Sequence, residues 1–417
     1  MASARFSLRY VRRFTTVAGD ATTTTLETAA APSSGKISVS KAKSILKKVH
    51  DPDKALEIYS NVSNLDASPV ASRYAQELIV RRLAKCNRFS DIETLIESNK
   101  NDPNIKEEPF YSAMLIRSYG QASMFDHAMR TFEEMDQYET PRSAVSFNAL
   151  LTACLHSKNF DKVPQLFDEI PQRYNNIVPD KISYGILIKS YCDSGSPEKA
   201  IEIMRQMEGK SIEVTTFAFT AILDSLYKSS KLDIAENLWN EIVKKGWEFD
   251  NAAYNVRIMS VQKESPERVE ELIDEMISKG LKPDTISYNY LLTAYCEKGM
   301  LDEAKKVYEG LKVNGCAPNA ATFRTLIFHL CDNGLYEQGY AVFKKSVKMN
   351  KIPDFNTLKH LAAGLVKNKK TDDAKGLIRS VKKKFPPSNA WNKLGEELGL
   401  YSKTDASSSS EGKEVAA

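Results

Sequence analysis

The segment from Thr285 to Asn319 is followed directly by a second segment, Ala320 to Asp354, that repeats its pattern with a shift of 35 residues. Each segment contains two amphipathic stretches of helical length, and the apolar pair Leu291-Leu292 of the first corresponds to Leu326-Ile327 of the second. A fixed period of this size is typical of a solenoid. A single helix hairpin cannot bury such apolar faces, so stability must come from stacking on neighbouring hairpins. The sequence therefore predicts an all-α solenoid of helix-turn-helix repeats.

The same register extends towards the N-terminus. Apolar pairs recur at Leu115-Ile116, Leu150-Leu151, Leu187-Ile188 and Ile222-Leu223. Small residues recur in the second helix at Ala128, Ala200, Ala235, Ala304 and Ala374, where close helix approach requires a small side chain. Gly195, Gly299 and Gly334 fall between the two helices, as expected for residues just after a helix C-terminus.

The period divides the chain into about nine or ten units. Seven are clear: 109–143, 144–180, 181–215, 216–250, 251–284, 285–319 and 320–354. Residues 36–108 are expected to form two degenerate units that meet near Ser72, and 355–389 a degenerate unit with a weak first helix. We expect residues 390–401 to form a terminal cap helix and 402–417 a disordered tail.

Composition excludes some classes of protein. The chain is 42% hydrophobic and 27% charged, and no apolar run approaches the 18 residues of a membrane-spanning helix. Three of the six cysteines, Cys192, Cys296 and Cys331, occupy the twelfth position of their units, and Cys154 is one residue short of it. A recurring small position of this kind favours packing over a disulfide or a metal site.

The first 31 residues differ from the rest. They contain Arg5, Arg9, Arg12 and Arg13, have no acidic residue before Asp20, and are rich in Thr and Ala. This composition predicts an organelle transit peptide, with a disordered tail as the alternative. Because Arg12-Arg13-Phe14 before Thr15 resembles a mitochondrial processing site, we favour the mitochondrial matrix over the chloroplast.

The units share Ser or Thr, an aromatic residue and often Asn near the start, a C-x-x-G segment, an acidic pair before Ala in the second helix, and a G-x-x-P-D/N end. Together these features resemble the P subclass of the pentatricopeptide repeat family, which is found mostly in plant organelles. The resemblance covers residues 36–389. It implies a right-handed superhelix whose first helices line a groove for single-stranded RNA, with one base per unit.

The family pattern also assigns candidate site residues. The second residue of each unit would sandwich the bases: Phe110, Val145, Ile182, Phe217, Ala252, Ile286 and Ala321, of which the two alanines are thin. The fifth residue and the last would read the base edge. Asn148 with Asp180 and Asn255 with Asp284 resemble the uridine pair, Thr220 with Asp250 the guanosine pair, and Asn289 with Asn319 the pyrimidine pair. The predicted RNA sequence is x-U-x-G-U-Y-x.

Other interpretations of these positions remain open. The Asn and Asp residues can be helix caps and turn residues, and at the unit ends both roles can hold. Three units match no familiar pair: Ala113 with Ser143, Gly185 with Thr215, and Arg324 with Asp354.

The positive charge of the chain is concentrated near its C-terminal end. Between Lys344 and Lys384 there are 13 Lys and Arg residues against three Asp, whereas the net charge of the whole chain is +4. Nine lysines could neutralise RNA phosphates: Lys344, Lys345, Lys348, Lys367, Lys369, Lys370, Lys382, Lys383 and Lys384. The alternative is an ordinary solvated helix face.

These features favour binding over catalysis. There is no H-x-E and P-C-x-x-C deaminase signature, no phosphate-binding loop and no nucleophile elbow. None of the five histidines lies at metal-ligand spacing from a Cys or an acidic cluster. We therefore expect no catalytic residue, metal, cofactor, small-molecule substrate or membrane partner. The main hypothesis is an RNA-binding protein of mitochondrial RNA metabolism or translation. The alternatives are a component of the small subunit of the mitochondrial ribosome, with rRNA and ribosomal proteins as partners, and a protein-binding scaffold.

Overall fold

The computed structural model describes residues 38–47, 49, 51–60, 69–100, 109–384 and 389–400. Within these residues the regular secondary structure is helical and contains no strand. The predicted transit peptide, 1–31, and the predicted tail, 402–417, lie outside the described residues.

The helices form two compact units, residues 1–86 and 87–417. The first unit contains α1 (Val39–Leu46), α2 (Pro52–Ser60) and α3 (Pro69–Lys85). The second contains α4 (Phe89–Lys100), α5 (Pro109–Gln121), α6 (Phe125–Glu133), the 3-10 turn η2 (Glu134–Asp136), α7 (Ala144–His156), α8 (Lys162–Arg173), α9 (Lys181–Asp193), α10 (Pro197–Gly209), α11 (Thr216–Lys228), α12 (Leu232–Lys244), α13 (Asn251–Val261), α14 (Pro266–Ser278), α15 (Thr285–Glu297), α16 (Leu301–Gly310), α17 (Ala320–Asp332), α18 (Tyr336–Lys348), α19 (Phe355–Lys367), α20 (Thr371–Lys384) and α21 (Asn389–Glu397).

In the first unit, local capping and one long-range hydrogen bond organise the three helices. The Asp51 carboxylate caps α2 by accepting the backbone N–H groups of Asp53 and Lys54 at 2.9 and 3.0 Å. Arg82 on α3 donates to the carbonyl of Leu46 at the end of α1, at 2.7 Å. α3 begins at Pro69, three residues before the point where the sequence predicted the second repeat to start.

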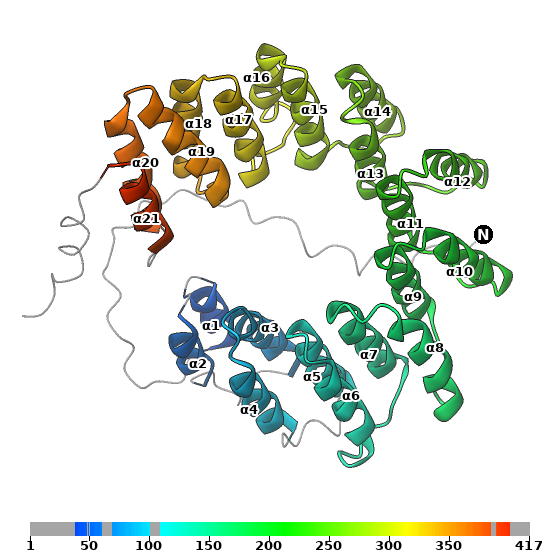
Figure 1. Ribbon diagram of the computed structural model, residues 1–417. Coiled ribbons are helices and arrows are strands. Elements are labelled where there is room, and N and C mark those ends of the chain that lie inside the picture. Colours follow the sequence, from blue (N-terminus) through cyan, green and yellow to red (C-terminus); the bar gives the residue numbers. More distant parts are fainter. Residues whose placement is uncertain are drawn as a thin grey trace, which may run out of the picture. The chain divides into compact units, whose positions relative to one another are not determined.

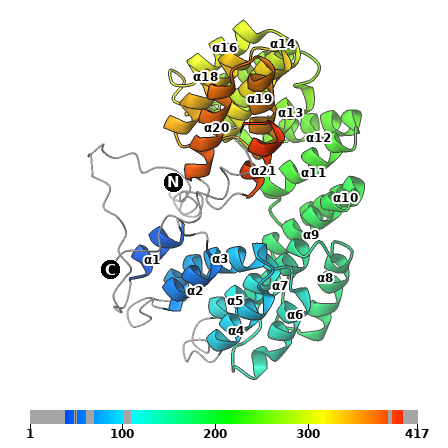
Figure 2. The same ribbon diagram turned by 60° about the vertical axis from the view of Figure 1, so that its left-hand side comes forward.

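From α5 onwards, the second unit is a regular series of helix pairs. A helix begins at each residue where a repeat is predicted to start: Pro109, Ala144, Lys181, Thr216, Asn251, Thr285, Ala320 and Phe355. Each of these first helices contacts its own second helix, and each one before α19 also contacts the first helix of the next pair. The first helices thus form one layer and the second helices another (Figure 1; Figure 2). The prediction of an all-α solenoid of helix pairs is confirmed.

The turns and the core explain the recurring small residues. Gly195, Gly299 and Gly334 have φ angles of +77°, +73° and +74°, which only glycine adopts without strain. The alanines of the second helices, Ala128, Ala200, Ala235, Ala304 and Ala374, are fully buried. The closest approach is at Gly364 on α19, where an added Cβ atom would lie 2.0 Å from the Tyr336 ring. These small residues leave room for the close packing of neighbouring helices.

The cysteines of the repeat positions belong to this core. Cys154, Cys192, Cys296 and Cys331 are free and buried, and burial raises the pKa of each thiol to about 12. The interpretation of these cysteines as packing residues is confirmed. Among the described residues, no group of three or more His, Cys, Asp or Glu side chains could hold a metal ion. None of the helices described is long and apolar enough to cross a membrane.

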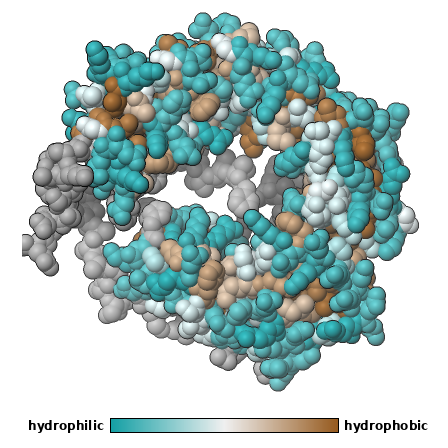
Figure 3. Space-filling model, viewed as in Figure 1, coloured by the Kyte–Doolittle hydropathy of each residue, from teal (hydrophilic) through white to brown (hydrophobic). Residues whose placement is uncertain are grey.

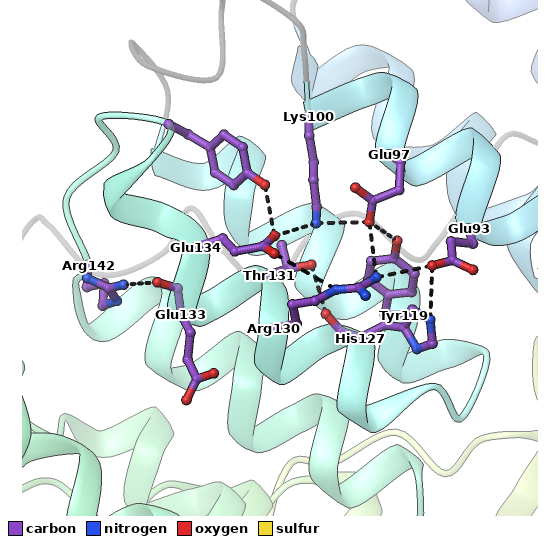
Figure 4. A network of polar contacts seen from close by, with 11 residues as sticks. Glu93, Glu97, Lys100, Tyr119, His127, Arg130, Thr131, Glu133, Glu134 and Arg142 are labelled. Atoms are coloured by element: carbon purple, nitrogen blue, oxygen red, sulfur yellow. Dashed lines mark hydrogen bonds and ion pairs between the residues drawn. The ribbon is translucent and has the colours of Figure 1, made fainter.

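A network of charged and polar side chains joins α4 to α6 in the second unit (Figure 4). The Lys100 ammonium lies 2.9 Å from both Glu97 and Glu134, and the Tyr119 hydroxyl donates to Glu97 at 2.7 Å. Burial alone would lower the pKa of Lys100, but its hydrogen bonds to Glu134 and Glu97 outweigh this effect and raise it. Burial would likewise raise the pKa of Glu97, yet the hydrogen bonds from Lys100 and Tyr119 lower it. The network therefore stabilises both charged groups.

Candidate nucleic-acid interface

Three of the four predicted base-reading pairs are joined by a hydrogen bond between neighbouring first helices. The amide nitrogen Nδ2 of Asn148 donates to Asp180 Oδ1 at 3.0 Å, and Asn255 donates to Asp284 in the same way at 3.2 Å. The third pair, Asn289 and Asn319, is joined at 3.2 Å. The structure therefore brings together the fifth residue and the last residue of each of these units.

A third residue, which was not predicted from the sequence, completes each of these pairs. The hydroxyls of Ser183, Ser287 and Thr322 donate to the Oδ1 atoms of Asn148, Asn255 and Asn289 at 2.6, 2.6 and 2.7 Å. Each hydroxyl also accepts the backbone N–H of the capping residue, at 3.1, 3.3 and 3.1 Å. Because Oδ1 faces a donor while Nδ2 faces an acceptor, the network fixes the orientation of the amide. The sequence signal was a Ser or Thr at the third position of the unit that follows each Asn.

The capping and base-reading interpretations are compatible at the unit ends. Asp180 Oδ1 accepts the backbone N–H groups of Ile182 and Ser183, both at 2.9 Å, and so caps α9. Its contacts with the described residues use Oδ1, which leaves Oδ2 available to a ligand. One amide N–H of Asn148 is also available, although this residue is only 3% exposed. A donor beside an acceptor suits the edge of uracil, which presents one N–H group between two carbonyl oxygens.

The fourth predicted pair is different. Thr220 and Asp250 share no hydrogen bond among the described contacts, and the buried Oγ1 of Thr220 has no partner there. Two differences accompany this: Thr220 has no amide to reach the cap residue, and Ala253 at the third position of the next unit has no hydroxyl. Asp250 Oδ1 accepts the backbone N–H of Ala253 at 3.0 Å and acts as a helix cap. The structure does not connect the predicted guanosine pair.

Several of the predicted sandwiching residues are exposed apolar side chains. Phe110, Ile182, Phe217 and Ile286 each lie at the second position of a first helix and are 47–63% exposed, whereas Val145 is partly buried. Figure 3 shows apolar side chains at the surface in several places among mostly hydrophilic ones. Large apolar groups held in water at one repeated position can provide stacking surfaces for unpaired bases.

The predicted phosphate-binding lysines lie mainly in a different layer. Lys344, Lys345 and Lys348 are on α18 and Lys382, Lys383 and Lys384 on α20, both second helices; the last two side chains lie outside the described residues. Lys367 ends α19, and Lys369 and Lys370 follow in the turn. Some of these charges have partners, since Lys370 lies 3.1 Å from Glu337 and Lys344 lies 4.7 Å from the Tyr340 ring centroid. The base-reading pairs and the α18 and α20 lysines are therefore on separate surfaces.

Comparison with known proteins agrees with this architecture. The model of the PPR repeat family matches residues 142–193, 179–228 and 283–332, and a PPR repeat model matches 114–139 and 217–247. The chain is 81% identical to the Small ribosomal subunit protein mL103 (rPPR7) of Arabidopsis thaliana, over 100% of both chains. It is 66% identical to a mitochondrial pentatricopeptide repeat-containing protein, At2g18520, of the same plant, over 100% of this chain and 98% of that protein. The crystal structure of the pentatricopeptide repeat protein PPR10 from maize aligns with 86% of this chain and 60% of its own chain. The sequence identity is 16% and the TM-score is 0.44.

The chain belongs to the pentatricopeptide repeat family. The resemblance inferred from the repeat pattern is therefore confirmed. The predicted mitochondrial location is also confirmed by the full-length relatives.

Proposed function

We propose that this protein binds single-stranded RNA as a component of the mitochondrial ribosome. The observation that carries the proposal is the 81% identity, over the whole of both chains, to a protein of the small ribosomal subunit. We infer that its role is binding and not catalysis.

The three Asn and cap pairs supply the RNA contacts in this proposal. An RNA strand lies along the layer of first helices, and its bases stack against apolar residues such as Ile182, Phe217 and Ile286. The amide of Asn148 or Asn255 donates to a carbonyl oxygen of uracil, and the free carboxylate oxygen of the partner Asp accepts its N–H group. The lysines of α18 and α20 neutralise phosphates of RNA on the other layer, without sequence preference.

A second candidate is a factor that binds one mitochondrial transcript. The chain is also 66% identical, over its whole length, to a mitochondrial pentatricopeptide repeat-containing protein. The three connected pairs also give some sequence preference, although three positions are too few to select one site in a transcript.

Gradient sedimentation of mitochondrial lysate tests the proposal. We expect the protein to migrate with a ribosomal subunit and to move to light fractions when magnesium is chelated and RNase is added. Sequencing of the crosslinked RNA should then give rRNA. Light fractions without RNase treatment, together with crosslinks to one messenger RNA, would support the second candidate. Absence of any crosslinked RNA would refute both and leave the protein-binding scaffold.

A further inference from the structure

A hollow of about 430 Å³ lies in the layer of first helices, at the unit whose fifth and last residues match no familiar base-reading pair. It is lined by Arg324, Phe328 and His329 of α17 and by Asp354, Asn356 and Thr357 at the start of α19. Arg324 is the fifth residue of its unit and Asp354 the last. The hollow therefore occupies the place of a base-reading site but has different chemistry.

The difference begins at Thr357, the counterpart of Ser183 and Ser287. In the Asn units this hydroxyl donates to the amide oxygen, but the guanidinium of Arg324 has no acceptor. The Thr357 hydroxyl instead donates to Asp354 Oδ2 at 2.9 Å, and its backbone N–H donates to Oδ1 at 3.1 Å. Burial would raise the pKa of Asp354, but these two bonds outweigh burial, and the charge of Arg324 adds to them, so the pKa is lowered. Both carboxylate oxygens thus already have partners, unlike those of Asp180.

Arg324 is exposed, and its guanidinium makes no hydrogen bond or ion pair within the part of the chain that is described. Its five N–H donors are therefore available to a ligand at the hollow. A guanidinium with free donors is well suited to a phosphate, which it can bind through two parallel hydrogen bonds.

Phe328 follows Arg324 by one helical turn, about 6 Å along the helix axis. Its ring is 43% exposed. The imidazoles of His329 and His360 lie 5.2 and 5.9 Å away and meet the phenyl ring at 86° and 64°, so neither is stacked on it. An exposed aromatic ring beside an arginine is the usual combination for holding an unpaired nucleotide.

We propose that this hollow binds one nucleotide of single-stranded RNA without base preference, with the base stacked on Phe328 and a phosphate bound by Arg324. The inference rests on the proposed function and assigns this unit a role that the fifth-and-last-residue code does not give. Arg324 can only donate and both oxygens of Asp354 already have partners, so this unit lacks the donor and acceptor pair with which the Asn units would read a base edge. Stacking and a phosphate contact do not depend on which base is present.

Binding of the full chain to short fluorescent single-stranded RNAs tests the proposal. The RNAs carry A-U-A-G-U-U-N, where N is each of the four bases or an abasic residue. We expect the four bases to bind within about twofold of one another, and the abasic RNA to bind about 5- to 150-fold more weakly. Phe328→Ala should weaken binding of the four base-containing RNAs by the same factor and should no longer distinguish them from the abasic RNA.

The phosphate contact is tested by salt dependence. Arg324→Gln should reduce the slope of log affinity against log salt by about 0.7, as expected for one phosphate contact on a single strand. Arg205→Gln, at an exposed arginine of the second helix α10 and outside the lysine-rich segment, is the matched charge control and should leave binding to these RNAs unchanged. Phe89→Ala is the control for Phe328→Ala, since Phe89 is equally exposed at 43%.

Each outcome is decisive. The proposal is wrong if Phe328→Ala and Arg324→Gln behave like their controls, or if the unaltered protein distinguishes the four bases at N by more than about tenfold. If the unaltered protein binds these RNAs and neither variant changes the binding, this inference is refuted but the RNA-binding function is not. Failure of the unaltered protein to bind any of the RNAs would refute the RNA-binding function and the inference with it.

Discussion

The Ser287 hydroxyl is the best place to test how the Asn and cap pairs work. It is completely buried, donates to Asn255 Oδ1 at 2.6 Å and accepts the backbone N–H of Asp284 at 3.3 Å. Ser287→Ala removes both bonds and leaves one buried acceptor and one backbone donor without partners. A net hydrogen bond contributes about 0.5–1.5 kcal/mol, and an unsatisfied buried group costs about 1–3 kcal/mol. We therefore expect the free energy of unfolding to fall by about 2–3 kcal/mol.

The same substitution should also weaken base selection. Without the hydroxyl, the Asn255 amide keeps its bond to Asp284 but loses the group that holds its oxygen. The hydrogen bond contributes about 1 kcal/mol to the free energy that favours one orientation of the amide. Without it, discrimination between uridine and cytidine at this position should fall about fivefold. Urea denaturation followed by circular dichroism measures the first effect. Competition between RNAs that differ only at this base measures the second.

Ser278→Ala is the matched control. Its hydroxyl donates to the carbonyl of Glu275 at 2.8 Å on the exposed surface of α14, so the change should stay within about 0.5 kcal/mol and leave selection unaffected. If Ser287→Ala destabilises no more than this control, the hydroxyl does not support the pair. If it destabilises the fold but keeps full preference for uridine, the orientation argument is wrong.

Three further predictions concern the network, the helix contacts and the stacking residues. The pKa of Glu97 is lowered, so its contribution to stability is present above the unfolded pKa of about 4.3 and is lost as pH falls through the folded pKa. The pKa of Lys100 is raised, so its contribution is present below the unfolded pKa of about 10.4 and is lost as pH rises through the folded pKa. The difference in melting temperature between the unaltered protein and Lys100→Met should thus be constant from about pH 5 to 9 and shrink at both extremes; a difference independent of pH would contradict this. Gly364→Ala should lower the free energy of thermal unfolding by about 1–3 kcal/mol, because an added Cβ atom has no room beside Tyr336. Gly185→Ala, where no atom lies within 4 Å of the added Cβ, should raise it by about 0.5–1 kcal/mol. Equal effects of the two substitutions would refute the close approach at Gly364. Phe217→Ala should leave stability within about 0.5 kcal/mol but weaken RNA binding about 5- to 150-fold, and unchanged affinity would remove it from the interface.

The period of 35 residues was enough to predict the helix pairs. The pairing of the fifth and last residues came from the resemblance to the family, and the structure joins three of these pairs by a hydrogen bond. The weak first helix expected after Phe355 is in fact α19, a full helix of 13 residues. Its Leu358, Leu361, Ala362 and Leu365 follow the spacing of a buried helical face, a signal that was present in the sequence.

What the sequence did not predict depends on contacts between units. The Ser183 hydroxyl is 35 residues from the amide it orients, and only the packing of α9 on α7 shows that they meet. The absence of a bond between Thr220 and Asp250 likewise became visible only in the packed structure, where Thr220 Oγ1 is buried without a partner among the described residues. The lysine-rich segment was recognised by its charge, but charge counts do not tell which layer of helices carries each side chain.

Mass-spectrometric mapping of ultraviolet crosslinks between the protein and its bound RNA tests the central claim most directly. The account predicts that uridines crosslink to peptides of the first helices α7, α9, α13 and α15, near Asn148, Ile182 and Asn255. Lysine-rich peptides of α18 and α20 should give crosslinks without base preference. Crosslinks confined to second helices, with none on the first-helix layer, would contradict the claim that the Asn and cap pairs form the RNA-binding surface.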